Sequence, residues 1–340
     1  MRKDVYYGEY LQLDKILDAQ LPESDKEGIE AHDEMLFIII HQAYELWFKQ
    51  IIYELTSIHT IFSKQTINDN APDLYKVVHR MKRIATILDV AVHQISIMET
   101  MTPLDFLDFR NLLRPASGFQ SIQFKMVEAM LGLKLEHRFG KEYYLSQLKE
   151  SDKEIIRKAE TQTSIIEEIN KWLERMPFFD DPSLWMNYKG KEFWTDYKEA
   201  YGASLTEGEK QNLEQFSNVF FSEDFAKNRR FSTRANRAAL FISLYRDYPL
   251  LQLPFQLLNL LLDLDELMSS WRSRHVNMVH RMIGKRIGTG GSSGKDYLKS
   301  ALDKHYIFQE VAELNTFLIE RSRLPKLPDA LEKRLGFVHG

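Results

Sequence analysis

The chain has 340 residues, of which 44% are hydrophobic and 12% aromatic, and its formal net charge is −4. This length and composition are typical of a folded globular protein with a sizeable core. The acidic balance disfavours a nucleic-acid-binding protein, because such proteins are more often basic. The absence of cysteine excludes disulfides, thiolate-bound zinc, cysteine-ligated iron–sulfur clusters, and haem held by thiolate or attached covalently.

Targeting and membrane-spanning signals are not found in the sequence. The N-terminal residues 1–10 lack the apolar core of a signal peptide. The longest apolar stretch, around residues 255–264, is too short to span a bilayer and is broken by Gln256, Asn259 and Asp263. We therefore expect a cytoplasmic protein that engages neither a membrane nor nucleic acid.

Helical periodicity dominates the chain and predicts an all-α protein. Asp33 is expected to cap one long helix, Pro254 to lie in the first turn of another, and Gly284 to end that second helix. A short helix is expected over 104–113. Long helices are expected over residues 34–63, 72–99, 119–137, 151–176, 207–221, 233–247, 254–283 and 303–320.

A change of composition suggests how the chain is divided. Between residues 178 and 232, an aromatic and lysine-rich stretch is followed by a polar helical segment. The pattern predicts a small inserted helical lobe over 178–232. The larger helical domain then comprises residues 1–177, with an N-terminal arm, and residues 233–340.

One apolar helix carries a histidine at its centre, in M-L-F-I-I-I-H-Q-A-Y-E-L-W-F at 35–48. The helix is apolar over most of its circumference, which is typical of a buried helix. A buried imidazole has to satisfy both ring nitrogens, so His41 is either a core histidine bonded to a backbone carbonyl or a pocket residue. At 100° per residue, one face carries Phe37, His41, Tyr44 and Phe48.

A second histidine, His275, lies near the end of another apolar helix. A flat apolar face with one imidazole suits the proximal side of a haem plane, and the alternative is again a satisfied core histidine. His280 lies about 140° further around the helix, so the two cannot form an i, i+4 metal pair. The stripe around His275 is completed by Leu264, Met268, Trp271, Met278 and Met282.

Two further motifs allow more than one interpretation. His32, Asp33 and Glu34, with a distant histidine, could form a two-histidine, one-carboxylate iron site, although the two acids are explained more simply as a helix cap and a first-turn acid. The glycine-rich turn G-T-G-G-S-S-G at 288–294 follows a helix and lacks the phosphate-binding pattern. It is either a flexible linker or a lid that brings Thr289 to a substrate.

Arg110 stands in the apolar segment F-L-D-F-R-N-L-L, beside the turn P-A-S-G-F-Q-S at 115–121. It is either paired with Asp105 or Asp108 or poised for an anionic ligand, and the guanidinium fork suits a carboxylate. The bare sequence favours the salt bridge.

Long motifs of the chain resemble the tryptophan 2,3-dioxygenase family, haem enzymes that open the indole ring of L-tryptophan. The resemblance thins only over 178–232, where the animal enzymes have a similar inserted lobe. Lys125, where the family is expected to have arginine, and Met35 depart from the pattern without touching a proposed contact. The motifs stand in family order: Y-G-E-Y-L-Q-L-D-K-I-L at 7–17, H-D-E-M-L-F-I-I-I-H-Q-A-Y-E-L-W-F-K-Q at 32–50, D-F-R-N-L-L-R-P-A-S-G-F-Q-S-I-Q-F at 108–124, P-F-Q-L-L at 254–258 and R-H-V-N-M-V-H-R-M-I-G-K-R-I-G-T-G-G-S-S-G at 274–294.

The resemblance implies a haem b cofactor and two sets of residues around it. His275 would be the proximal ligand of the iron, with Trp271 and Ser117 against the haem. On the substrate side, His41 would accept the indole N–H. Arg110 would pair with the substrate carboxylate, Thr289 would bind the ammonium and carboxylate end, and Phe37 and Phe106 would pack around the indole.

The resemblance also implies the reaction and the assembly. Both atoms of O2 would be inserted across the indole C2–C3 bond to give N-formylkynurenine, the first step of the kynurenine pathway. Tyr7 and Tyr10 would complete the pocket of a neighbouring subunit, which implies a homotetramer with exchanged N-terminal segments. Two other functions are left open: oxidation of another indole, and a haem-binding sensor or carrier.

Overall fold

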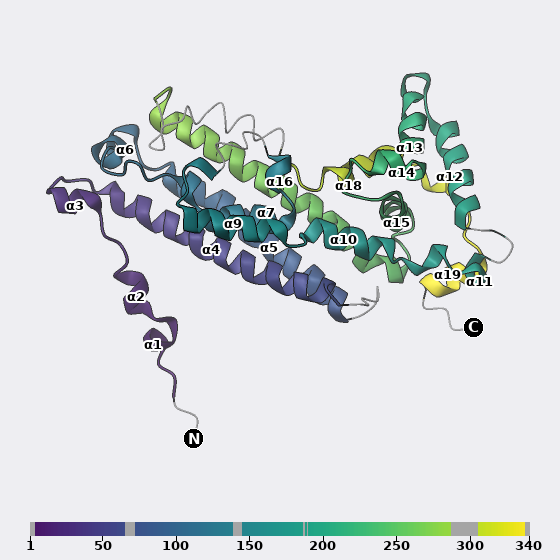
Figure 1. The fold of residues 1–340 in the computed structure, drawn as a ribbon, viewed down its shortest axis with the longest axis horizontal. Coiled ribbons are helices and arrows are strands. Elements are labelled where there is room, and N and C mark those ends of the chain that lie inside the picture. The colour runs from purple at the N-terminus through teal and green to yellow at the C-terminus, as the bar shows by residue number, and fades with distance from the viewer. Residues whose placement is uncertain are drawn as a thin grey trace.

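The structure is a computed structural model that describes residues 4–64, 72–138, 145–185, 188, 190–286 and 305–336. Over these residues the regular structure is helical and no strand is found, which confirms the predicted all-α class (Figure 1). The predicted segments 288–294 and 303–304, with Thr289, lie outside the described residues.

The helices fall into two groups along the chain. The N-terminal half contains α1 (Tyr7–Leu11), α2 (Leu13–Leu17), α3 (Glu23–Glu27), α4 (Asp33–Phe62), α5 (Pro72–Met98), α6 (Pro103–Arg110), η1 (Gly118–Gln120), α7 (Ile122–Leu131), η2 (Leu135–His137), α9 (Glu150–Thr161) and α10 (Ile165–Glu174). The rest contains η3 (Pro177–Phe179), α11 (Pro182–Trp185), α12 (Gly190–Ser204), η4 (Glu207–Glu209), α13 (Gln211–Phe221), α14 (Glu223–Ala226), α15 (Thr233–Leu244), α16 (Pro249–Ile283), α18 (Gln309–Glu313), η5 (Leu314–Phe317), η6 (Arg321–Arg323) and α19 (Asp329–Leu335).

Three long helices form the body of the molecule. Helix α5 packs against both α4 and α16, and the shorter helices α7, α9 and α10 lie along this body (Figure 1). On α4 the fully buried residues Ile51, Leu55 and Ile58 recur every three or four positions, which is the spacing of one helix face. Burying one such side chain stabilises the fold by roughly 1.5–3 kcal/mol.

Several helix boundaries differ from the prediction. Helix α4 begins at Asp33 itself, and the preceding residue His32 makes no side-chain cap, so the capping role predicted for Asp33 is wrong. Helix α16 begins five residues before Pro254, which lies buried inside it. The leucines that precede it prolong the apolar face, and Leu251 is fully buried. Gly284 ends α16 with a positive φ of 58°, as expected.

Several predicted helices are divided or shortened. The segment 207–221 contains η4 and α13, and the described part of 303–320 contains α18 and η5 as its helices. The segment 151–176 is broken between α9 and α10, where Ser164 starts a capping box with Glu167. The Ser164 N–H donates to the Glu167 carboxylate at 2.6 Å. The segment 119–137 contains η1, α7 and η2, because Gly132 adopts a φ of 133° that ends α7.

An aromatic cluster fills the part of the molecule formed by residues 178–232 together with α15 and η5. It belongs to the same continuous hydrophobic core as α4, α5 and α16. Tyr197 also donates a hydrogen bond to the Phe317 carbonyl at 2.7 Å. The buried rings are Phe178, Trp185, Phe193, Trp194, Tyr197, Tyr201, Phe216, Phe220, Phe231, Phe241 and Phe317. The boundaries of an inserted lobe stay a prediction.

No single helix among those described is both long and apolar enough to cross a membrane. The consecutive helices α5 and α6, bent by 92°, meet the criteria of length and composition only as a pair.

Candidate functional site

The imidazole of His41 lies on the aromatic face of α4 that the sequence predicts. Its ring centroid is 4.2 Å from that of Phe37, which stacks at 5.7 Å on Phe106 from α6. His41 Nδ1 lies 2.7 Å from the Phe37 carbonyl oxygen. A carbonyl can only accept, so Nδ1 carries the proton and Nε2 of the neutral ring is left as an acceptor.

Burial lowers the pKa of His41 below its ordinary value, whereas the bond to the Phe37 carbonyl and the charge of Glu45 act in the opposite direction. The imidazole is therefore neutral at pH 7. A neutral ring with Nδ1 occupied can accept one hydrogen bond at Nε2, which suits an N–H group of a ligand.

His275 lies on α16, where its ring stacks on that of Trp271, with centroids 5.4 Å apart and an interplanar angle of 30°. Burial and the nearby charge of His41 lower the pKa of His275 to about 4. The ring is neutral and its lone pair is available at pH 7. No hydrogen bond to either ring nitrogen comes from the part of the chain that the structure describes.

Tyr44 joins the two histidines through ring contacts. Its centroid is 6.4 Å from that of His41 and 6.0 Å from that of Trp271. The Tyr44 hydroxyl donates to the Ala91 carbonyl of α5 at 3.2 Å, and burial raises the pKa of Tyr44 to about 12. A continuous series of rings thus connects α6, α4 and α16: Phe106, Phe37, His41, Tyr44, Trp271 and His275.

Arg110 is the last residue of α6 and is only 4% exposed. The salt bridge with Asp105 or Asp108 that the sequence favours is formed with neither acid. The Asp105 carboxylate accepts the N–H and O–H of Thr102 at the opposite end of α6. Burial lowers the pKa of Arg110, and so do the positive charges of Arg114 and Arg286. This concentration of positive charge favours an anion.

The turn after α6 carries Ser117 and packs against the ring series. Ser117 caps η1 in a capping box with Gln120. Phe124, in the first turn of α7, lies 4.7 Å from Trp271 between ring centroids. Ser117 therefore belongs to the segment that leads into α7, and Phe124 of that helix packs on Trp271.

The tie between this turn and α4 is not among the sequence-based predictions. The Glu45 carboxylate accepts the Ser121 hydroxyl at 2.6 Å and the Gln123 amide at 2.8 Å. Glu45 stands one helical turn after His41, a spacing that could have drawn attention to it. Tyr44 and Phe124 likewise lie within the family motifs, where the sequence alone assigns them no role.

The N-terminal tyrosines do not join this cluster within one chain. Tyr7 and Tyr10 lie in α1, with exposed fractions of 72% and 74%. The segment with α1 and α2 projects from the body of the molecule (Figure 1). Their expected role is therefore one that requires another chain.

The rival iron site at residues 32–34 is contradicted. Among the residues that the structure describes, no three His, Asp or Glu side chains are grouped so that they could hold a metal ion. The Glu34 carboxylate instead accepts the backbone N–H groups of Glu23 and Ser24, both at 2.9 Å, and so fastens α3 to the start of α4.

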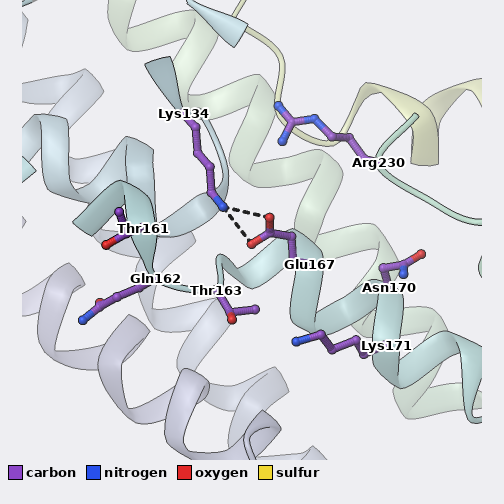
Figure 2. A pocket seen from close by; sticks show the side chains of 8 residues that line it. All are labelled: Lys134, Thr161, Gln162, Thr163, Glu167, Asn170, Lys171 and Arg230. Carbon is purple, nitrogen blue, oxygen red and sulfur yellow. Dashed lines mark hydrogen bonds and ion pairs between the residues drawn. The ribbon is translucent and has the colours of Figure 1, made fainter. Parts of the chain in front are cut away.

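A separate hollow of about 360 Å³ is lined by polar side chains of another region (Figure 2). Lys134 donates to both oxygens of Glu167 there, at 2.8 and 3.0 Å. It contains none of the predicted site residues. Its lining comprises Lys134, Thr161, Gln162, Thr163, Glu167, Asn170, Lys171 and Arg230.

The fold and the site thus define an all-helical protein in which two neutral histidines adjoin one aromatic cluster, with a buried arginine nearby. A profile of the tryptophan 2,3-dioxygenase family matches residues 1–318. The chain is 44% identical to the tryptophan 2,3-dioxygenase of Alteromonas mediterranea, over 99% of each chain. It is 42% identical to that of Bdellovibrio bacteriovorus, over 98% of each, and 42% identical to that of Dictyostelium discoideum, over 99% of this chain and 89% of the other. The chain belongs to the tryptophan 2,3-dioxygenase family.

Proposed function

We propose that this chain is a haem-dependent dioxygenase that inserts both atoms of O2 across the indole C2–C3 bond of L-tryptophan and gives N-formylkynurenine. Membership of the family over nearly the full length supports this activity, and the family implies a haem enzyme. The observation that carries the proposal at the level of residues is the neutral His41, whose Nε2 is left to accept an indole N–H within an aromatic cluster.

The residues around His275 fit a haem b. The neutral imidazole has an available lone pair, and its neighbour Trp271 presents an apolar surface. His275 would hold the iron, while Trp271 and Ser117 would contact the haem. When bound, the haem supplies the centre at which O2 is activated.

The protein binds and orients the substrate. Phe37 and Phe106 offer flat apolar surfaces to the indole, and His41 fixes its rotation through the N–H. Arg110 pairs with the carboxylate, and Thr289 binds the ammonium and carboxylate end. A cationic fork, a hydroxyl and an aromatic slot match a zwitterion with a flat apolar side chain, and fixing this geometry lowers the entropic cost of the reaction.

The assembly belongs to the same proposal. Tyr7 and Tyr10 complete a neighbouring chain's pocket in a homotetramer, which accounts for the exposure of both rings in one chain. Residues 1–177 and 233–340 form the haem-binding domain, and residues 178–232 an inserted lobe. The protein acts in the cytoplasm.

The test is an anaerobic optical titration of the reduced, haem-loaded protein with L-tryptophan, followed by admission of O2. We expect the haem spectrum to shift with tryptophan and N-formylkynurenine to form. A haem spectrum that does not respond to tryptophan, with no product, would contradict the proposal and move the function to another indole or to haem sensing.

A further inference from the structure

We propose that Glu45 is a positioning residue that holds residues 117–124, the turn and the start of α7, against the helix of His41 and so fixes one wall of the substrate site. The inference rests on the proposed function, which it deepens. It starts from a half-buried carboxylate that lies one turn from His41 and contacts a segment more than seventy residues away in the sequence.

Three hydrogen bonds join Glu45 to the turn. Ser121 Oγ donates to Glu45 Oε1 at 2.6 Å, and Gln123 Nε2 donates both to Oε2 and to the Glu45 carbonyl oxygen, each at 2.8 Å. Bonds to a charged acceptor are about twice as strong as neutral ones. Ser121 Oγ also accepts the Phe124 N–H at 3.2 Å, so the same hydroxyl starts α7 and anchors it to α4.

The position of the turn determines the position of several rings. Phe124 packs at 5.2 Å from Phe48 of α4 and at 4.7 Å from Trp271 of α16, measured between centroids. Trp271 in turn stacks on His275. Glu45 therefore joins the helix that carries His41 to the segment that carries Ser117, and the Phe124 ring extends this contact to Trp271 beside His275.

The charge of Glu45 gives it a second effect. The Glu45 carboxylate accepts its hydrogen bonds from a hydroxyl and an amide, which are both neutral. Among the described side chains, no cation forms an ion pair with it. Its charge therefore acts on His41, whose pKa it raises against the effect of burial. Glu45 is the one acid whose charge contributes to the pKa of His41. Other titratable groups on this part of α4 and on the elements packed against it include Tyr44, Lys49, Arg110, Lys125, Glu128, Arg274 and His275.

Two substitutions separate the hydrogen bonds from the charge. Glu45→Ala removes both, and we expect kcat/KM for tryptophan to fall roughly 10- to 100-fold, the cost of a displacement of about 1 Å at a reacting geometry. Glu45→Gln can still accept from Gln123 and donate to Ser121, so kcat/KM at its pH optimum should stay within about threefold of the starting protein. The acidic limb of its kcat/KM–pH profile should move to lower pH by roughly 0.5–1.5 units, because the protonated form of His41 loses a stabilising negative charge.

Gln123→Leu tests whether Glu45 acts through its contact with Gln123, because this change removes the amide donor and keeps the Ser121 cap of α7. If Glu45 acts through this contact, the loss in the double variant Glu45→Ala/Gln123→Leu should be smaller than the product of the two single losses. Wild-type kinetics of Glu45→Ala, or a strictly multiplicative double variant, would overturn the proposal.

A control variant and a measurement that needs no turnover distinguish failure of this proposal from failure of the proposed function. Glu167→Gln neutralises another half-buried carboxylate that ties two elements together (Figure 2), and it should leave the pH profile unchanged. An NMR pH titration of the His41 ring C–H signal, assigned with His41→Gln, needs no turnover. A lower pKa of His41 in Glu45→Gln, and not in Glu167→Gln, supports the effect of Glu45 on His41. An unchanged pKa of His41 overturns it, even if tryptophan proves not to be the substrate.

Discussion

His41 and His275 are both kept neutral by burial, yet they differ in what their nitrogens do. His41 donates from Nδ1 to the Phe37 carbonyl, whereas no described group bonds to His275. A ring fixed by one bond presents a single acceptor in a defined direction, as substrate orientation requires. The neutral ring of His275 leaves a nitrogen lone pair that could coordinate a metal.

At the residue scale, Arg110→Ala is expected to raise KM for tryptophan roughly 10- to 100-fold while haem stays bound. A charge-assisted bond to a carboxylate contributes about 1.5–3 kcal/mol, and Arg110 is buried beside other cations. Arg157, an exposed arginine on α9, provides the control, since Arg157→Ala should keep the starting KM. Tryptophan binding of normal strength in Arg110→Ala would show that the carboxylate lies elsewhere.

His275→Ala should lose stable haem, because no other described histidine adjoins Trp271. The haem content per chain, read from the absorption spectrum, checks this. Added imidazole should restore part of the haem by filling the space of the missing ring. His93→Ala, at an exposed histidine of α5, should load normally. Full loading of His275→Ala with an unchanged spectrum contradicts the assignment of the iron ligand.

At the scale of elements, a buried ionic group connects α7, α16 and the segment after η2. Glu128 Oε1 accepts Arg272 Nη2 and Oε2 accepts Arg138 Nη1, both at 2.6 Å. Arg272 also donates to the His305 carbonyl at 3.2 Å. Arg272 precedes His275 by less than one turn of α16, so this group fixes the helix that carries the proposed iron ligand.

Glu128→Gln should lower the free energy of unfolding by roughly 3–5 kcal/mol, because it removes the carboxylate charge that bonds the buried guanidinium groups of Arg138 and Arg272. Urea-induced unfolding at pH 7 checks this value. Glu150→Gln, in an exposed pair with Lys153, should cost less than about 1 kcal/mol. Equal costs in the two variants would show that the buried group contributes no more than a surface pair.

The same group predicts the pH dependence of stability. Burial alone would raise the pKa of Glu128, but the charges of Arg138 and Arg272 outweigh it and lower the pKa to about 2. Since the folded pKa lies below the unfolded one, this stabilisation is present above about pH 4.5 and is lost as the pH falls towards 2. Acid unfolding of Glu128→Gln should therefore be less steep over this range.

Helix existence is predictable from the sequence, and several helix ends are not. The capping box that separates α9 from α10 is visible in Ser164 and Glu167, but the apolar periodicity on both sides obscures it. A helix start at Pro254 is the natural expectation, because proline suits the first turn. Burial of Leu251 and its neighbours outweighs the hydrogen bond that this proline removes.

At the scale of the whole molecule, the apolar side chains of the N-terminal arm are not covered by the rest of the same chain. Its exposed apolar side chains are too many for an isolated segment in water, and they are Val5, Tyr6, Tyr7, Tyr10, Leu11, Ile16, Leu17 and Leu21. Contact with other copies of the chain would cover them.

A mixing experiment tests whether the N-terminal arms are exchanged between chains. The double variant Tyr7→Ala/Tyr10→Ala should raise KM for tryptophan, and His275→Ala should be inactive. Co-expressed, the two should form assemblies in which intact arms of the second chain complete the pockets of the first, so that part of the activity returns. Activity no greater than that of the tyrosine variant alone would mean that the arm serves its own chain. Sedimentation analysis checks that mixed assemblies form.

The sequence by itself determined the all-α class, the three longest helices α4, α5 and α16, and the family, because apolar periodicity and motif order are local properties of the chain. It also placed Phe37 and His41 on one face of a helix. Only the tertiary structure decided that both histidines are neutral, that Asp105 caps α6 and does not pair with Arg110, and that Glu45 reaches Gln123. Burial and contacts between distant segments depend on how helices pack, and no spacing along the chain encodes them.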